Sequence, residues 1–219
     1  MAFRKPEEYG KVIALTFDDG PNVTCTPKVL DLLEKYGVKA SFFLIGDNID
    51  EQSAEVVKRA YTMGCEINNH SRSHQAMDSF TTRQIKAEVE YTSKLIEQTV
   101  GEPPKFFRPP FIAVSDTLFD SVDLPFISGR GCEDWEESVS AQERIDRVLS
   151  QVEDGVIILM HDQKFNFKTV EALETIIPEL LSRGYEFVTV SELFYAKGVT
   201  PRTGKDRFIY SNCLQTTNW

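Results

Sequence analysis

Short apolar runs rich in β-branched residues alternate along the chain with longer stretches of helical periodicity. Parallel strands need long crossover connections, so this alternation is typical of a parallel sheet built from βα units. The runs that predict strands are residues 12–17, 40–45, 66–69, 105–108, 124–128, 156–160 and 186–190. The stretches that predict helices are residues 26–36, 51–63, 81–100, 140–152, 169–183 and 191–195. We therefore expect an α/β fold of about seven βα units in one continuous array.

The chain shows no break that would divide it into two folding units. No linker, low-complexity segment or internal repeat interrupts its 219 residues, and this length suits one large domain. We therefore expect residues 1–196 to form a single domain. Residues 197–219 lack periodicity, and we expect this tail to pack on the surface or to be partly disordered.

Acidic residues outnumber basic residues in this chain. The sequence has 24 Lys and Arg against 34 Asp and Glu, a formal net charge of −10, and its pI is near 4.9. This charge would repel a polyanion, so neither nucleic acid nor an anionic membrane is an expected partner. No run of about 18 apolar residues could span a bilayer. A neutral substrate, or a cation bound by carboxylates, agrees better with the charge.

The cysteines and the first residues bear on the cellular compartment. Four cysteines stand far apart with no CxxC pair, which argues against a zinc ribbon or a redox motif. We expect buried thiols, and two disulfides remain open if the chain is exported. The basic pair near the start has no apolar segment behind it, so it does not read as a secretory signal. The chain as written is therefore expected in the cytoplasm, or it is secreted after removal of a leader.

Polar residues stand where several predicted strands end. In a βα barrel, the side chains just past the carboxyl end of each strand share one face and form the active site. Asp18 and Asp19 follow strand 12–17 and precede a Gly-Pro turn. Neighbouring carboxylates point in different directions, so one can bind a metal while the other faces a substrate. A lone aspartate here would more often cap a turn, and the pair favours a functional site.

The chain has three histidines, and all of them follow predicted strands. His70 and His74 come after strand 66–69, and residues four apart lie on one face of a helical turn. Two imidazoles and one carboxylate would make a three-ligand site for a divalent metal such as zinc, with one coordination position left open. A lone histidine would more often be structural, but the placement of all three favours function.

The third histidine, His161, ends a strongly apolar run. An unperturbed imidazole titrates near neutral pH, so His161 could exchange a proton in catalysis. Hydrolysis of an ester or amide needs such a second group on the side of the site opposite Asp18. The alternative is a packed histidine that is hydrogen-bonded to Asp162, and the spacing alone leaves both interpretations open.

Two further segments carry groups suited to the same chemistry. Arg108 precedes two prolines and can hold a carboxylate through a bidentate pair, while the backbone amide of Phe111 is free to donate to an oxyanion. The alternative for Arg108 is a surface arginine before a turn. Asp134 stands beside Trp135, one of two tryptophans. Sugars commonly stack on such a ring, and a core tryptophan is an equally good interpretation.

Five segments taken together resemble the motif series of the polysaccharide deacetylase family, carbohydrate esterase family four. They occur in the family's order as TFDDG at 16–20, HSRSH at 70–74, RPPF at 108–111, DW at 134–135 and LMH at 159–161. The resemblance covers residues 11–195. It implies a distorted (β/α) barrel of about seven parallel strands, with residues 1–196 as the catalytic barrel. It also implies hydrolysis of acetyl groups on sugars.

The resemblance implies a role for each matching residue. The metal ligands would be Asp19, His70 and His74. The catalytic residues would be Asp18 as general base, His161 as general acid, Arg108 to hold Asp18, and Asp134 to tune His161. The substrate would meet the Phe111 amide, the ring of Trp135 and the side chain of Leu159. Zinc is the expected ion, with cobalt, nickel or manganese as alternatives.

The second half of the chain also looks like the acetylxylan esterase members of this family. The expected substrate is therefore an acetylated carbohydrate, and specifically the O-acetyl esters of xylan. The first alternative is removal of N-acetyl groups from chitin-type or peptidoglycan glycans. The others are a carbohydrate-binding barrel without catalysis and a hydrolase of cyclic amides. The sequence indicates no oligomeric state.

Overall fold

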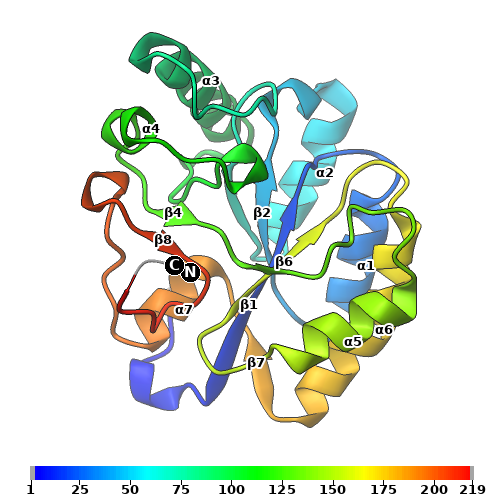
Figure 1. Cartoon of the computed structure of the whole chain (residues 1–219). Helices are drawn as coiled ribbons and strands as arrows, with labels where there is room; N and C mark the ends of the chain where they lie inside the picture. Colours follow the sequence, from blue (N-terminus) through cyan, green and yellow to red (C-terminus); the bar gives the residue numbers. More distant parts are fainter. Residues whose placement is uncertain (1–2, 218–219) are drawn as a thin grey trace.

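Strand β1 (Lys11–Asp18) lies at the centre of a parallel sheet in the computed structural model, which describes residues 3–217 (Figure 1). The strand order is β3-β2-β1-β6-β5, and β7 pairs with the first half of β1. The other strands of this sheet are β2 (Ser41–Leu44), β3 (Glu66–Asn69), β5 (Arg130–Gly131), β6 (Ile157–His161) and β7 (Tyr185–Phe187). The α/β class and the parallel sheet predicted from the sequence are confirmed.

A second pair of strands closes the sheet into a distorted barrel. Strand β4 (Phe126–Ile127) pairs in parallel with β8 (Ile209–Tyr210). Phe107 forms single bridges to Asn69 on one side and Phe126 on the other. After β8, residue 212 forms an antiparallel bridge with residue 156, which directly precedes β6. The barrel is closed, but three of its strands are two residues long.

The prediction of a strand at 105–108 is wrong. The first two residues of this segment bond to a side chain, and only Phe107 forms bridges. The side chain of Asn68 accepts hydrogen bonds from the backbone N–H groups of Lys105 and Phe106. Two prolines follow at 109 and 110, and proline has no N–H to donate to a ladder. Two bridges at Phe107, one to each neighbouring segment, are what remains of the predicted strand.

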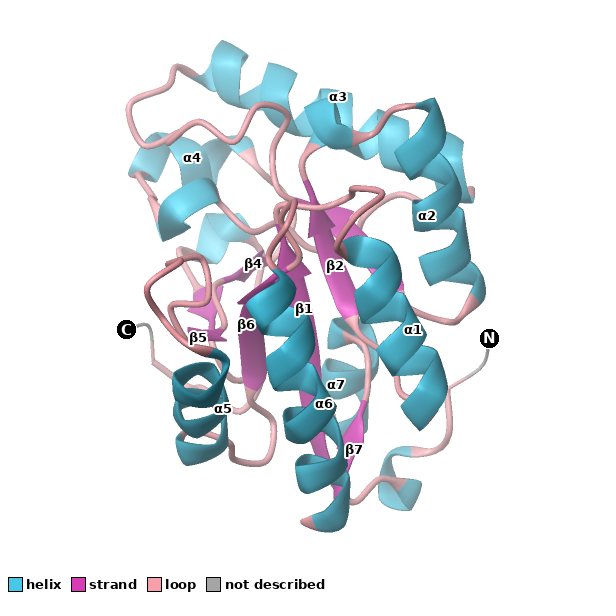
Figure 2. Cartoon of the chain, turned by 90° about the vertical axis from the view of Figure 1, so that its right-hand side faces the viewer, coloured by secondary structure: helices cyan, strands magenta, loops and turns pink. Residues whose placement is uncertain are grey.

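Helices cover the outside of the barrel, and α1, α5 and α6 lie together along one side of the sheet (Figure 2). The six predicted helices are present as α1 (Thr26–Tyr36), α2 (Glu51–Thr62), α3 (Thr82–Val100), α5 (Ala141–Ser150), α6 (Phe167–Ser182) and α7 (Val190–Ala196). Four of them begin at a side chain that accepts from the first turn, namely Asp50, Thr81, Ser140 and Thr189. Helix α4 (Asp116–Ser121) was not predicted, because six residues are too few to show periodicity.

Part of the segment after α7 is built into the barrel. Phe208, Tyr210 and Cys213 are buried, and β8 supplies the only partner strand of β4 within residues 3–217. The sequence could not show this, because a two-residue strand has no period. The division of the chain at residue 196 stays a prediction, and the last two residues of the expected tail lie outside the described part.

The alternation of side chains along β1 determines what points into the barrel. Successive residues of a strand face opposite sides. Ile13, Leu15 and Phe17 join the cluster beneath the outer helices, whereas Val12 and Ala14 join a cluster on the other face. Asp18 therefore points inward, and its register partner on β6 is His161.

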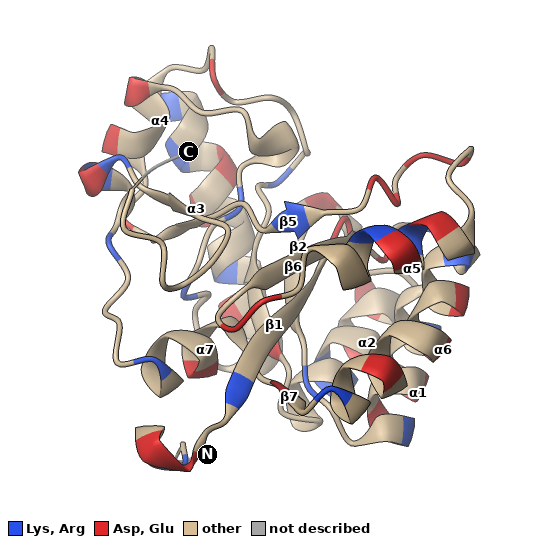
Figure 3. Cartoon of the chain, turned by 60° about the horizontal axis from the view of Figure 1, so that its bottom comes forward, with Lys and Arg blue, Asp and Glu red and all other residues tan. Residues whose placement is uncertain are grey.

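Charged residues of both signs are spread over the helices and loops, while the central strands are largely free of them (Figure 3). Among the described residues, no helix has both the length and the apolar content needed to cross a membrane. All four cysteines are buried free thiols. Burial raises the pKa of Cys65 to about 11 and, with the charges of nearby aspartates, that of Cys25 to about 12.

Candidate metal and catalytic site

Asp19, His70 and His74 meet at the carboxyl ends of β1 and β3. Oδ1 of Asp19 lies 3.5 Å from Nε2 of His70 and 3.2 Å from Nε2 of His74. The ligand atoms of these three residues all lie within 4.8 Å of one another. This is the three-ligand group that the sequence predicted.

The hydrogen bond of His70 shows that its other ring nitrogen is free to bind a cation. Nδ1 of His70 lies 2.7 Å from the backbone oxygen of Arg108, and a carbonyl can only accept, so Nδ1 carries the proton. Nε2 of the neutral ring then has a lone pair, and it faces Asp19 Oδ1. This oxygen is buried and has no hydrogen-bond donor within residues 3–217. Two electron-pair donors that face each other in this way fit a cation between them.

The protonation states also fit a metal site. Burial would raise the pKa of Asp19, but the neighbouring imidazoles, His70 above all and then His161 and His74, lower it to about 2. Burial and the charge of His70 lower the pKa of His74 below its usual value. At neutral pH the aspartate is therefore ionised and His74 is neutral, which are the forms that bind metals.

The expectation that His70 and His74 lie on a helical turn is wrong. Residues 70–74 form a loop, with left-handed φ angles at Ser71 (66°) and His74 (56°). Glu88 of α3 holds this loop, because its carboxylate accepts from the backbone N–H groups of Arg72 and Ser73. The strained loop still places the two imidazole centroids 5.0 Å apart. Strain of this kind is typical of functional sites.

Arg108 holds Asp18 from inside the barrel. Its side chain is fully buried, and one guanidinium nitrogen donates to Oδ1 of Asp18 at 2.5 Å. The second terminal nitrogen donates to the hydroxyl of Thr16 at 3.0 Å, so the pair is not bidentate as expected. Thr16 precedes Asp18 on the same face of β1, which is why one arginine reaches both. The other oxygen of Asp18 lies 3.6 Å from Nε2 of His70.

Asp134 holds His161 on the opposite side of the group. Oδ1 of Asp134 lies 2.8 Å from Nδ1 of His161, and Oδ2 accepts from the His161 backbone N–H at 2.7 Å. Burial would lower the pKa of His161, but the hydrogen bond and charge of Asp134, with the charges of Asp18 and Asp19, raise it to about 9. The partner of His161 is thus Asp134, and the alternative pairing with Asp162 is wrong.

The three predicted substrate-contacting residues border the same group. The exposed ring of Phe111 lies 4.7 Å from that of His74, and its backbone N–H has no partner among the described residues. The half-exposed ring of Trp135 lies 5.3 Å from that of His161. Leu159 is buried two residues before His161, and a Cβ at Gly131 would contact both Trp135 and Leu159.

Gly20 and Asp162 pack against each other at the end of β1, next to Asp18 and Asp19, and the sequence analysis missed this contact. The carboxyl of Asp162 is fully buried and accepts from the hydroxyl of Thr26, while its backbone N–H donates to the carbonyl of Asp18. A Cβ at position 20 would lie 2.7 and 2.8 Å from the two carboxyl oxygens. Position 20 must therefore be glycine for Asp162 to fit. The sequence feature that could have identified Asp162 is its position directly after His161.

Gly20→Ala is expected to destabilise the fold by about 1–3 kcal/mol, the usual cost of overpacking a buried site. For a chain of this size that corresponds to a fall in Tm of roughly 2–12 °C. Calorimetry of the variant measures it. Gly10→Ala is the matched control, since a Cβ there meets nothing nearer than 3.4 Å. An unchanged Tm for Gly20→Ala would contradict the steric argument.

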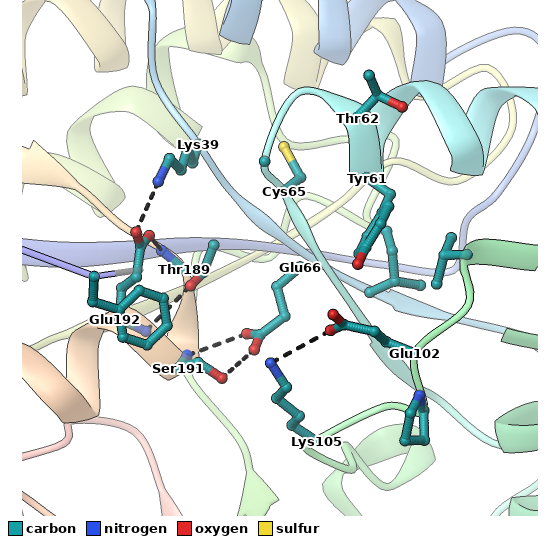
Figure 4. A pocket seen from close by; sticks show the side chains of 15 residues that line it. Lys39, Tyr61, Thr62, Cys65, Glu66, Glu102, Lys105, Thr189, Ser191 and Glu192 are labelled. Carbon is teal, nitrogen blue, oxygen red and sulfur yellow. Dashed lines mark hydrogen bonds and ion pairs between the residues drawn. The ribbon is translucent and has the colours of Figure 1, made fainter. Parts of the chain in front are cut away.

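A pocket of about 410 Å³ opens far from this group, at the amino ends of β2 and β3 (Figure 4). Its two most buried acids are already bonded to protein groups. Glu192 pairs with Lys39 at 2.7 Å, and Glu66 accepts from the hydroxyls of Ser41 and Ser191. The catalytic candidates all lie at the carboxyl ends of the strands, so this pocket is not their site.

Comparisons with known proteins agree with the geometry. Residues 5–124 match the family model described as polysaccharide deacetylase. The chain is 52% identical over 191 residues to a bifunctional xylanase/deacetylase of Pseudobutyrivibrio xylanivorans, covering 87% of this chain but 32% of that protein. It is 35% identical over 194 residues to a peptidoglycan-N-acetylglucosamine deacetylase of Bacillus cereus, covering 85% of this chain and 90% of that protein.

Solved structures give the same result. A Xyl-CE4 domain of a multidomain xylanase from the hindgut metagenome of Trinervitermes trinervoides is similar, with a TM-score of 0.90 and 49% identity over 93% of this chain and 98% of that domain. A family 4 acetyl xylan esterase from Clostridium thermocellum, in complex with a cobalt ion, has a TM-score of 0.90 and 44% identity, covering 94% of this chain and all of that one. The chain thus belongs to the polysaccharide deacetylase family, carbohydrate esterase family 4, and is similar to its xylan-esterase members.

Proposed function

We propose that this chain is a metal-dependent esterase that removes O-acetyl groups from xylan. The observation that carries the proposal is the position of the three-ligand group between Asp18, held by Arg108, and His161, held by Asp134. A base and an acid on two sides of one cation site are what ester hydrolysis requires. A protein that only binds sugars would need neither.

Asp19, His70 and His74 would hold the divalent ion. Their donor set of one carboxylate and two imidazoles suits zinc, and cobalt, nickel or manganese are also possible. When bound, the ion would supply Lewis-acid chemistry, polarising the acetyl carbonyl and favouring deprotonation of water. The cobalt ion in the similar esterase from Clostridium thermocellum supports a metal in this family.

Asp18 would act as the general base. Arg108 binds Oδ1 of Asp18 and leaves Oδ2 facing the cation site, 3.6 Å from Nε2 of His70. An attacking water in the cleft would give its proton to Oδ2 as its oxygen bonds to the acetyl carbon. The buried guanidinium fixes the direction of the carboxylate.

His161 would act as the general acid. Its Nδ1 is bound to Asp134, so its Nε2 is the nitrogen left to serve the site. As the bond between the acetyl carbon and the sugar oxygen breaks, Nε2 would protonate that oxygen. The products are acetic acid, which ionises to acetate in water, and a free sugar hydroxyl. Asp18 then holds the proton taken from the water and His161 lacks one, so proton exchange with solvent restores both residues.

Three further groups would position the substrate. The free N–H of Phe111 would donate to the oxyanion that forms on the acetyl carbonyl. The side chain of Leu159 and the ring of Trp135 would enclose the acetyl methyl group, next to the space left open at Gly131. The exposed face of Trp135 would also contact the sugar ring.

Similarity favours xylan over the N-acetylated glycans. The chain shares 52% and 49% identity with xylanase-linked deacetylase domains, against 37% with a peptidoglycan deacetylase of Listeria monocytogenes. The alternative rests on the same site, because an amide could bind where the ester does. N-acetyl removal from chitin-type or peptidoglycan glycans is therefore the second proposal.

Acetate release tests both proposals in one experiment. Acetylated xylan and an N-acetylglucosamine oligomer are each incubated with chelated protein and with protein to which zinc has been restored. We expect acetate from xylan once zinc is present. Release from the oligomer alone would support the second proposal, and release from neither substrate would contradict both.

A further inference from the structure

Arg144 on α5 is a fully buried cation without a direct acidic partner. Its side chain is 0% exposed, and within residues 3–217 no carboxylate lies in ion-pair distance of it. Burying an unpaired charge is costly unless hydrogen bonds and an opposite charge nearby compensate. The opposite charge is Asp134, which is equally buried.

Every nitrogen of the Arg144 guanidinium donates a hydrogen bond. Nε donates to the backbone oxygen of Val139 at 3.1 Å, and one terminal nitrogen donates to that of Glu136 at 3.1 Å. The other terminal nitrogen donates to Oδ1 of Asn166 at 2.6 Å and to the hydroxyl of Thr169 at 2.9 Å. Asn166 and Thr169, which accept these last two bonds, in turn donate hydrogen bonds to Asp134.

The bond to Thr169 sets the direction of a chain of hydrogen bonds. A guanidinium can only donate, so the Thr169 oxygen accepts from Arg144 and its single hydrogen points elsewhere. That hydrogen points to Oδ2 of Asp134, at 2.7 Å. Oδ2 also accepts from the backbone N–H of His161, so it has no place for a proton of its own. Oδ2 of Asp134 is therefore fixed as an acceptor.

The hydrogen bonds of Asp134 also bear on which ring nitrogen of His161 carries a proton. Two donors occupy Oδ2, so Asp134 faces the ring through Oδ1. A carboxylate is a far weaker base than an imidazole, so Nδ1 of His161 carries the proton in their 2.8 Å bond. Nε2 is then the nitrogen that gains and loses the catalytic proton. Asn166 joins the same groups by a second path, since its amide nitrogen donates to the backbone oxygens of Asp134 and His161.

We propose that Arg144 is a positioning residue which, through Thr169 and Asn166, holds Oδ2 of Asp134 as an acceptor and thereby fixes the orientation and the ring tautomer of His161. This inference rests on the proposed function, because it gives His161 its catalytic proton. It adds a specific part to that function: a fully buried arginine on an outer helix determines which nitrogen of the general acid is active.

Thr169→Val and Thr169→Ser are the matched test. Valine keeps the shape of threonine and removes the hydroxyl, whereas serine keeps the hydroxyl. We expect Thr169→Val to lower kcat on acetylated xylo-oligosaccharides about tenfold with KM unchanged, the usual cost of losing an outer partner of a catalytic ligand. Thr169→Ser should retain near wild-type kcat. Zinc affinity should be unchanged in both, because neither variant touches the metal ligands.

Nitrogen NMR of the imidazole rings gives a readout that does not depend on activity. The chain has three histidines, so the ring signals can be assigned with single-site variants. The spectra are recorded above the pKa of His161, where the ring is neutral and has a tautomer. There we expect the wild type and Thr169→Ser to hold the proton on Nδ1 of His161, and Thr169→Val to show exchange between tautomers. Arg144→Met should give the same change, and Arg144→Lys, which still only donates, a smaller one.

The outcomes separate the two proposals. If the wild type releases no acetate while the ring signals change as expected, the proposed function fails and the role of Arg144 in fixing the ring stands. If the wild type is active and Thr169→Val matches it in both kcat and ring signals, the inference about Arg144 is overturned. Circular dichroism of each variant identifies any that fail to fold, and the Thr169 pair then decides.

Discussion

Acetate release is expected to fall at least about a thousandfold when His70 or Asp19 is replaced by alanine, because each substitution removes one of three ligands. Lewis-acid stabilisation of the transition state supplies several kcal/mol, and about 4 kcal/mol corresponds to this factor. The measurement pairs kcat on acetylated xylan with the zinc content of the purified variant. We expect both to be lost together.

The control for this prediction is a nearby carboxylate outside the ligand group. Asp47 lies on the loop after β2 and pairs with Arg72 at 2.9 Å, well exposed to solvent. Asp47→Asn should keep both activity and bound zinc. Full activity in a wild-type sample shown to be metal-free would contradict the assignment of Asp19, His70 and His74 as metal ligands.

Replacing His161 with alanine is expected to lower kcat on acetylated xylan by about 10²–10⁴-fold, the usual contribution of a general acid. The reason is the leaving group, since a sugar oxygen departs poorly without a proton. The control is therefore a second substrate with a better leaving group. With 4-nitrophenyl acetate, whose leaving group is stable as an anion, the loss should be much smaller. An equal loss on both substrates would argue against a general acid.

The pH profile checks the same residue in the wild type. A general acid works in its protonated form, so activity should hold below the pKa of His161 and fall above it. Asp134 and its neighbours raise that pKa to about 9, and a bound divalent cation would lower it, so the fall is expected at or below pH 9. Asp134→Asn removes the raising charge and should move the fall to lower pH.

The sequence predicted most of the site because the relevant residues follow strands. Asp18, His70 and His161 each follow a predicted strand, and parallel strands bring their carboxyl ends to one edge. Asp18 and His161 are register partners, so two residues 143 positions apart became neighbours through strand pairing alone. The motif resemblance then identified their partners, Arg108 and Asp134.

The parts that the sequence could not predict depend on single side chains rather than on periodicity. The loop at 70–74 follows left-handed angles that Glu88 supports from α3. The segment at 105–108 is bonded to the side chain of Asn68 at its start, and its pairing is limited to the bridges of Phe107. Arg144 reads as an ordinary surface residue of an amphipathic helix, and only its contacts in three dimensions show that it is buried. None of these has a spacing that a pattern search would detect.

The four buried thiols can be used to measure local opening of the folded chain. Alkylating reagents attack the thiolate, which burial disfavours, so labelling requires the surroundings of each cysteine to open. The cysteines lie at four separate places: the start of α1, the start of β3, the loop after β5 and the segment after β8. Their labelling rates would therefore measure opening separately in each region. No probe has to be introduced for that purpose, because the native sequence already carries one in each region.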